Sequence, residues 1–259
     1  MSHKKLIAFD LDGTLAPSKS PLPDRIAELL DQLLQKYQVC VISGGKFGQF
    51  EKQLLSNLKA DPIQLENLHL MPTCGTRYYK YDIVKKEWEK VYAEDFTEAE
   101  KAKIIEALKT SVKKLGFDSE KTYGPTFEDR GSQITWSALG QDIVDELGEE
   151  GLRVKHAWDA DNAKKNAVRD DAAELLPEFE VRVGGVTSID ITKPGIDKAY
   201  GMKKLIDMLE ISKDEILFIG DRIQEGGNDY PVKQMGIDCV EISTWQETAH
   251  TVQGIIYVS

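Results

Sequence analysis

The chain has 259 residues, of which 41% are hydrophobic and 30% charged, the balance of a folded globular protein and not of a disordered chain. Its formal net charge of −11 argues against a nucleic-acid partner, because such a partner is held by a basic excess. No stretch approaches the roughly 18 apolar residues of a membrane span, and the three separated cysteines do not indicate a disulfide framework. We therefore expect a cytoplasmic protein with no membrane partner.

The first third of the chain alternates strand and helix patterns. A continuous apolar run over Lys4–Phe9 predicts a buried strand, and Pro23–Gln35 carries apolar residues on one helical face. Gln38–Ile42 predicts a second buried strand, followed by a helix that runs to about Leu58. Uniformly apolar strands between helices are typical of a parallel sheet covered by helices on both faces.

The middle of the chain has a different pattern. Thr76–Tyr81 and Glu87–Tyr92 are short alternating segments around a polar turn, which predicts a hairpin. Thr97–Leu115 begins with a capping box and has one apolar face, so it predicts an amphipathic helix. The other elements predicted here are strands over Ser132–Ala138 and Val181–Ile191 and a helix over Asp161–Leu175.

The last quarter returns to the first pattern. Asp197–Leu209 has helical spacing, and Ile216–Ile219 predicts a strand that ends at Gly220-Asp221. We therefore expect the fold class α/β, with a mostly parallel, Rossmann-like sheet and an inserted α+β domain. The predicted core domain covers residues 1–82 and 192–259, and the predicted inserted domain covers residues 83–191.

The clearest chemical signal is Asp10–Thr14 (Asp-Leu-Asp-Gly-Thr), directly after the first predicted strand. In an open parallel sheet, ligands bind beyond the carboxyl ends of the strands. Asp10 can attack a phosphorus atom while Asp12 protonates the leaving oxygen, a division of roles that suits covalent catalysis. The alternative is an acidic turn that caps the following helix.

A second acidic strand end supports the catalytic interpretation. Asp221 follows the strand near the other end of the chain, and Gly226–Asp229 closes the same loop. Asp10, Asp221 and a backbone carbonyl of the first loop can bind Mg²⁺ through oxygen atoms. Such an ion offsets the repulsion between an anionic nucleophile and an anionic phosphate. Taken alone, Gly226–Asp229 also fits a surface loop.

Two further groups are candidates for holding the phosphate. The Ser43 hydroxyl and the amides of Gly44 and Gly45 follow the second strand and can surround phosphate oxygens, although a simple turn fits Ser43 equally well. Lys198 opens a helix and can supply a fixed positive charge. The alternatives are a solvent-facing Lys198, or Lys193 in the same role.

These four segments, in this order and with an insertion after the second, resemble the haloacid dehalogenase (HAD) superfamily of phosphotransferases. The position of the insertion is similar to that of subfamily IIB, whose members carry a cap domain of type C2B. The resemblance implies that Asp10 is the nucleophile, which forms an aspartyl-phosphate, and that Asp12 is the general acid/base. The other implied roles are phosphate binding by Ser43 and Lys198 and Mg²⁺ binding by Asp10, Asp221 and the Asp12 carbonyl, with Asn228 or Asp229 farther out.

Within that subfamily the chain is most similar to the eukaryotic-type phosphomannomutases. Their final loop resembles Gly220–Asp229, and their cap motifs resemble Glu128-Asp129-Arg130 and Gly184–Asp190. The resemblance implies that the cap contacts the sugar and its second phosphate, and that a homodimer is a family-level expectation. The implied contacts are Arg130, Ser188 and Asp190.

Two positions depart from the mutase pattern. Gln141 and Lys19 stand where the mutases have arginines, and neither side chain reproduces the planar guanidinium fork. A mutase must hold both phosphates of a bisphosphate intermediate, so a cap with fewer cations favours hydrolysis. We therefore expect a Mg²⁺-dependent phosphatase acting on a small phosphate monoester, preferably a sugar phosphate. A phosphohexose mutase is the first alternative, and a non-catalytic phosphosugar-binding protein is the alternative from another class.

Overall fold

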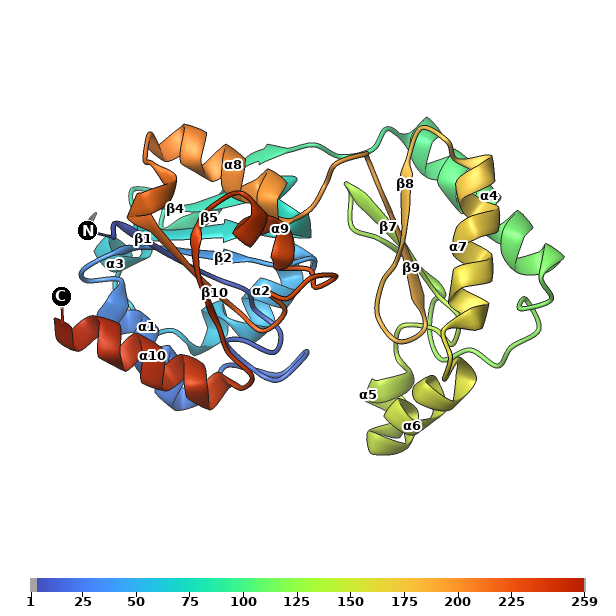
Figure 1. Cartoon of the computed structure of the whole chain (residues 1–259), viewed down its shortest axis with the longest axis horizontal. Helices are drawn as coiled ribbons and strands as arrows, with labels where there is room; N and C mark the ends of the chain where they lie inside the picture. The colour runs from blue at the N-terminus through green and yellow to red at the C-terminus, as the bar shows by residue number, and fades with distance from the viewer. Residues whose placement is uncertain (1–3, 259) are drawn as a thin grey trace. The chain divides into compact units, whose positions relative to one another are not determined.

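The computed structural model describes residues 4–258, which form two units (Figure 1). The core unit extends to Ala93 and resumes at Ile196, and the cap unit covers Glu94–Gly195. Both boundaries lie beyond those expected at residues 82 and 191. The reason is that strand β5 (Glu87–Ala93) pairs within the core sheet, while strand β9 of the cap sheet ends at Thr192.

The described part of the core unit contains a seven-stranded sheet in the order β11-β10-β1-β2-β3-β4-β5. The strands are β1 (Leu6–Phe9), β2 (Gln38–Ile42), β3 (Leu68–Met71), β4 (Arg77–Asp82), β5 (Glu87–Ala93), β10 (Ile216–Gly220) and β11 (Asp238–Glu241). Neighbours from β11 to β3 run parallel, and the β4–β5 hairpin adds two antiparallel strands at one edge. The predicted mostly parallel sheet is confirmed, and β3 and β11 are strands that the sequence analysis did not predict.

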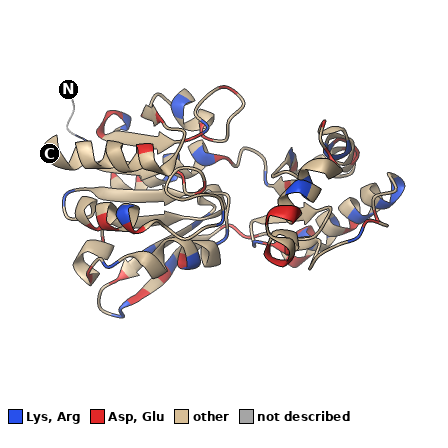
Figure 2. Cartoon of the chain, turned by 90° about the horizontal axis from the view of Figure 1, so that it is seen from below, with Lys and Arg blue, Asp and Glu red and all other residues tan. Residues whose placement is uncertain are grey.

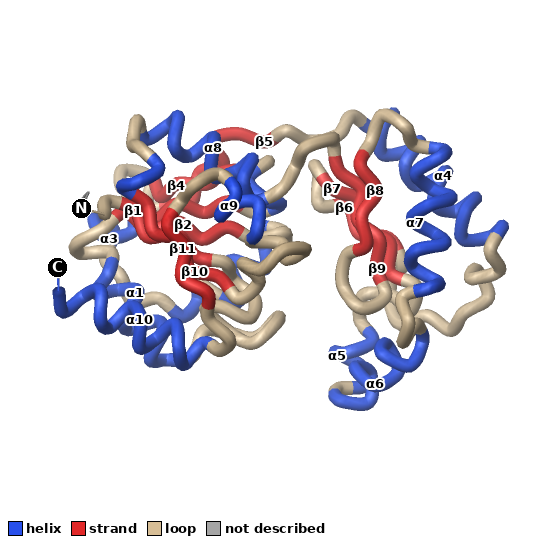
Figure 3. The backbone as a smooth tube through the Cα atoms, viewed as in Figure 1, coloured by secondary structure: helices blue, strands red, loops and turns tan. Residues whose placement is uncertain are grey.

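Helices cover both faces of this sheet (Figure 3). They are α1 (Asp24–Leu33), α2 (Phe47–Gln53), α3 (Pro62–Leu65), α8 (Lys198–Leu209), α9 (Tyr230–Gln234) and α10 (Trp245–Val258). Ile7 and Phe9 of β1 pack in the cluster that contains α1 and α10, whereas Leu6 and Ala8 pack in the cluster that contains α8 and α9. Alternate side chains therefore enter opposite faces, which is why the strand is apolar throughout. The helix expected to reach Leu58 ends at Gln53 and is followed by a short 3₁₀ turn.

The cap unit contains a four-stranded antiparallel sheet in the order β6-β7-β9-β8. Its strands are β6 (Phe127–Asp129), β7 (Gln133–Ser137), β8 (Glu180–Val183) and β9 (Ser188–Thr192), and its helices are α4 (Glu98–Lys114), α5 (Ile143–Leu147), α6 (Glu149–Trp158) and α7 (Ala163–Leu175). The predicted capping box of α4 is present. The single strand expected over Val181–Ile191 is wrong: this segment is a hairpin of two strands, which turns at Gly184 and Gly185.

The two faces of the cap sheet differ in chemistry. Ile134 and Trp136 of β7 and Ile189 and Ile191 of β9 pack with the apolar residues of α4 and α7. Residues between them, such as Thr135, point to the opposite face because side chains alternate along a strand. The face away from α4 and α7 is therefore polar.

Charged residues of both signs are interspersed over both units (Figure 2), in agreement with a net charge of −11 and no basic excess. Among residues 4–258, no helix combines the length and the apolar character needed to cross a membrane.

Candidate active site

An acidic cluster with one lysine lies at the carboxyl ends of β1 and β10. Carboxylate oxygens of Asp10, Asp221 and Asp229 lie within 4.8 Å of one another. The Lys198 Nζ atom is 2.6 Å from Asp10 Oδ1 and 2.5 Å from Asp229 Oδ1. Lys198 is only 1% exposed, so it is a buried ion-pair partner and not a solvent-facing lysine. Lys193, the alternative, lies in the cap unit and stacks over the Phe96 ring.

Burial and neighbouring charges shift the pKa values in this cluster. Burial raises the pKa of Asp10 to about 7, with Lys198 opposing the shift and Asp229 adding to it. Burial opposes the charged form of Lys198, but Asp10 and Asp229 outweigh it and raise the Lys198 pKa. Burial, and then the charge of Asp229, raise the pKa of Asp221. Three carboxylates thus share one lysine, and the cluster favours a further cation.

The acidic cluster fits a divalent metal ion. Asp221 Oδ1 is buried and has no hydrogen-bond partner among the described residues, although a buried carboxylate oxygen normally has one. An oxygen-only set of a few carboxylates is what Mg²⁺ prefers. Of the residues expected near the metal, Asn228 is exposed, whereas Asp229 is fully buried and belongs to this cluster.

The Asp12 carboxylate is held by three donors. Its Oδ1 accepts hydrogen bonds from the Lys19 backbone N–H (2.8 Å) and from Gln53 Nε2 (3.2 Å). Its Oδ2 accepts one from Gln49 Nε2 (2.7 Å). The two glutamines were not predicted. The available signal was their spacing, because residues four apart on a helix share a face. Lys19 contacts Asp12 through its backbone N–H.

The Ser43 loop follows β2 and is buttressed by the segment Thr73–Gly75. The Ser43 Oγ atom accepts a hydrogen bond from the Gly45 N–H (3.2 Å). The Cys74 N–H donates to the Ser43 carbonyl and the Thr73 N–H to the Gly45 carbonyl, each at 2.9 Å. Ser43 is therefore buried in a fixed turn at the same sheet edge as Asp10.

The buttressing segment has an unusual backbone. Thr73, Cys74 and Gly75 have successive φ angles of 49°, 54° and 82°, a left-handed run that is costly for two non-glycine residues. Gly75 packs directly on Gly201 of α8, the helix that begins with Lys198, and a Cβ atom at Gly75 would overlap Gly201. One strained segment therefore contacts both the Ser43 loop and the Lys198 helix.

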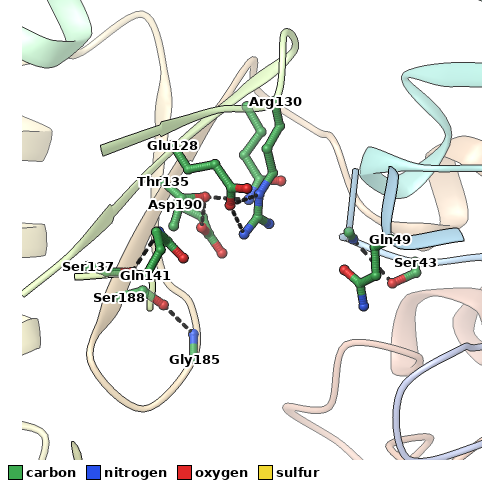
Figure 4. Close-up of polar contacts among 12 residues, drawn as sticks. Ser43, Gln49, Glu128, Arg130, Thr135, Ser137, Gln141, Gly185, Ser188 and Asp190 are labelled. Atoms are coloured by element: carbon green, nitrogen blue, oxygen red, sulfur yellow. Dashed lines mark hydrogen bonds and ion pairs between the residues drawn. The ribbon is translucent and has the colours of Figure 1, made fainter. Parts of the chain in front are cut away.

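The predicted cap residues lie on the polar face of the cap sheet (Figure 4). Arg130 donates from Nε to Glu128 Oε2 at 2.8 Å. Asp190 Oδ1 accepts a hydrogen bond from the Thr135 hydroxyl at 2.6 Å, and Ser188 Oγ accepts one from the Gly185 N–H at 2.7 Å. A fourth such contact, not predicted, runs from Gln141 Nε2 to Ser137 Oγ at 2.9 Å. The structure thus groups Arg130, Ser188 and Asp190 on one polar surface.

Comparison with known proteins defines the class. Residues 7–232 match the family described as haloacid dehalogenase-like hydrolase, so the chain belongs to this family and is a HAD-type phosphotransferase. The predicted resemblance to the HAD superfamily is confirmed, and so is the predicted α/β fold class.

Named relatives and solved structures narrow the comparison. The chain is 25% identical over 233 residues to a phosphomannomutase of Encephalitozoon cuniculi, covering 89% of this chain and 84% of that protein. It is 22% identical over 266 residues to a probable phosphomannomutase of Caenorhabditis elegans, covering 98% and 92%. The fold is similar to that of the IMP-nucleotidase of Plasmodium falciparum (TM-score 0.69, 18% identity, covering 98% of this chain and 68% of that chain). It is also similar to that of the trehalose-6-phosphate phosphatase of Aspergillus fumigatus (TM-score 0.57, 17% identity, covering 99% and 94%).

Proposed function

We propose that this chain is a Mg²⁺-dependent phosphatase that hydrolyses a phosphate monoester, preferably a sugar phosphate, through an aspartyl-phosphate on Asp10. The observation that carries the proposal is the buried pair of Asp10 and Lys198 beside the unpartnered oxygen of Asp221. A buried aspartate held by a lysine at a strand end is a fixed nucleophile, and the lysine offsets its charge as an anionic substrate approaches.

The reaction takes two displacements at phosphorus. The Asp10 carboxylate attacks phosphorus, the bond to the ester oxygen breaks, and Asp12 gives its proton to that oxygen. Asp12 then removes a proton from a water molecule, which attacks the aspartyl-phosphate and releases inorganic phosphate and free Asp10. Lys198, Ser43 and the Gly44 amide hold the phosphoryl oxygens through both steps.

Asp10 and Asp221, whose carboxylate oxygens lie within 4.8 Å of each other, would hold the metal ion together with the Asp12 carbonyl. Asp229 lies beside these carboxylates, and Asn228 is in the same loop. When bound, Mg²⁺ supplies positive charge that reduces the repulsion between the carboxylates and the phosphate.

The charge pattern of the cap favours hydrolysis over mutase activity. Arg130 is paired with Glu128, and Arg182 is paired with Glu180, so both arginines are already neutralised within the cap. A second phosphate needs cations that are available to it, whereas sugar hydroxyls need hydrogen-bonding groups of both kinds. We therefore propose that Arg130, Ser188 and Asp190 bind the sugar part of a monophosphate.

A phosphohexose mutase is the second candidate. It is favoured by the relatives named phosphomannomutase, which are similar over most of the chain. Both activities use the same aspartyl-phosphate, and they differ in whether water or a second sugar hydroxyl takes the phosphoryl group.

One assay separates the candidates. Hexose phosphates are incubated with the purified chain and Mg²⁺, and free phosphate and 1-to-6 isomerisation are followed in parallel, with and without a hexose 1,6-bisphosphate. We expect phosphate release that needs no bisphosphate; isomerisation that depends on the bisphosphate would instead establish the mutase.

A pair of variants tests the nucleophile. Asp10→Asn should abolish turnover, because an amide cannot form the phosphoenzyme. The variant would then be able only to bind a phosphosugar. Asp207→Asn, an exposed change on α8, is the control and should retain the activity of the wild type. Turnover that survives Asp10→Asn would overturn the mechanism. The homodimer and the cytoplasmic location stay predictions, and sedimentation of the purified chain tests the first.

A further inference from the structure

We propose that Gln49 and Gln53 of α2 are positioning residues for Asp12, and that they determine which of its two oxygens carries the transferable proton. The inference rests on the proposed phosphatase function, because it concerns the group that gives and takes the proton. It depends only on residues of the core unit.

The hydrogen bonds to Asp12 are unequally divided between its oxygens. Oδ1 accepts from both the Lys19 N–H and the Gln53 amide, whereas within residues 4–258 Oδ2 accepts only from the Gln49 amide. Each carboxylate oxygen has two lone pairs. Both lone pairs of Oδ1 are therefore used, and Oδ2 keeps one. The structure assigns Oδ2 as the site of the proton that Asp12 donates to the leaving group.

Gln53 is fixed by contacts of its own. It is 3% exposed, and its Nε2 also donates to the Ser20 carbonyl at 2.7 Å. Its backbone carbonyl accepts a hydrogen bond from the Leu22 N–H at 2.9 Å. Gln53 thus holds both the Asp12 side chain and the loop that follows it, so Oδ1 stays saturated.

Gln49 connects Asp12 with the Ser43 loop. Its amide oxygen lies where a Cβ atom at Gly45 would stand, so this glycine leaves the space that the glutamine fills. Figure 4 shows Gln49 next to Ser43. An amide is suited to this place, because it can orient a carboxyl group but does not exchange protons with it near neutral pH. A carboxylate or imidazole there would compete for the proton.

The test uses two substrates that differ in their need for a general acid. An alkyl phosphate releases an alkoxide, which needs the Asp12 proton, whereas p-nitrophenyl phosphate releases a stable phenolate. The kcat/KM value reports the first displacement, and therefore the acid step. We expect Gln49→Met to lower kcat/KM for the alkyl phosphate by about tenfold to a hundredfold, and that for p-nitrophenyl phosphate by less than about threefold.

The control is Gln32→Met, an exposed glutamine on α1, which should leave both values unchanged. Equal losses on the two substrates for Gln49→Met would mean a structural role only and would overturn the proposal, as would no loss on either. If Gln49→Met does not fold, Gln49→Asn removes the same contact by shortening the side chain and is judged by the same ratio.

Crystal structures of the wild type and Gln49→Met give a readout that does not depend on turnover. We expect the Asp12 carboxylate to rotate in the variant; an unchanged carboxylate would overturn the positioning role. If the wild type hydrolysed no phosphate ester, the proposed function would fail on its own, and this structural comparison would still decide the role of Gln49.

Discussion

Replacing Lys198 by methionine tests the electrostatics of the acidic cluster. The change keeps most of the side-chain volume but removes the charge that lies 2.6 Å from Asp10 and 2.5 Å from Asp229. Both aspartates are at most 3% exposed, so water cannot replace the lost partner. Breaking a buried ion pair by removing one partner costs about 3–5 kcal/mol, and we expect a loss of unfolding free energy in this range at pH 7.

The direction of the pH dependence follows from the same contacts. The charge of Lys198 lowers the pKa of Asp10, so removing this lysine raises the Asp10 pKa further above its value in the unfolded chain. A group with a raised folded pKa stabilises the protein below that pKa and loses the contribution as the pH rises. The difference in unfolding free energy between the wild type and Lys198→Met should therefore become smaller from pH 7 to pH 5. Mg²⁺ at a hundredfold excess over its Kd should add about 2–3 kcal/mol to the unfolding free energy of the variant, because the ion binds the folded cluster only.

Urea unfolding in EDTA and in Mg²⁺ measures these values, and hydrogen exchange locates them. Faster exchange is expected in β1 and β10, with β7 and β9 of the cap unit as an internal reference. Lys203→Met, an exposed change on the same helix, is the matched control. A loss below about 1 kcal/mol, the size of an exposed pair, would refute the reasoning.

Three further predictions concern other parts of the chain. Burial of His69, together with the charge of Lys80, lowers the pKa of this histidine from 6.5 to about 3, so His69 is neutral in the folded protein. The unfolded chain takes up a proton there as the pH falls, so the free energy of unfolding should decrease by about 2 kcal/mol between pH 7 and pH 5. Urea titration measures this decrease, with His69→Gln as the reference. Gly13→Ala should weaken Mg²⁺ binding by about tenfold in calorimetry, because the added Cβ atom overlaps the Asp221 carboxylate. The control is Gly236→Ala: Gly236 has the same φ of 85° but no atom near the added Cβ, so Mg²⁺ binding should be unchanged. Arg130→Met should raise the KM for the preferred sugar phosphate by about tenfold and leave the KM for p-nitrophenyl phosphate unchanged. Equal effects on the two KM values would contradict a role in sugar binding.

The sequence predicts the structure well where a local pattern of residues is compatible with one kind of element only. The predicted strand Gln38–Ile42 is apolar at every position from Val39 to Ile42, and it forms β2 with the predicted bounds. Asp10 and Asp221 follow strands that must be parallel, so their meeting at one sheet edge could be predicted from strand order alone.

Other features depend on partners that the sequence does not reveal. The alternating pattern of Glu87–Ala93 suits an edge strand of either sheet, and only its pairing with β4 places it in the core. In Val181–Ile191, the two glycines at the turn mark a hairpin, but the alternation on either side resembles one continuous strand. The contact of Gln49 with Asp12 joins two segments that are distant along the chain. The helical spacing places Gln49 and Gln53 on one face, but it does not show that this face meets Asp12.

The left-handed segment Thr73–Gly75 has a consequence for how this site can change over evolutionary time. Because it contacts both the Ser43 loop and Gly201, a side chain gained at Gly75 would displace the helix that carries Lys198. A side chain at position 75 or at position 201 should therefore be tolerated only if the backbone of the opposite segment moves away, and an insertion between 73 and 75 should not be tolerated. The Ser43 loop and the helix that carries Lys198 should therefore change together during evolution, because the same short segment contacts both.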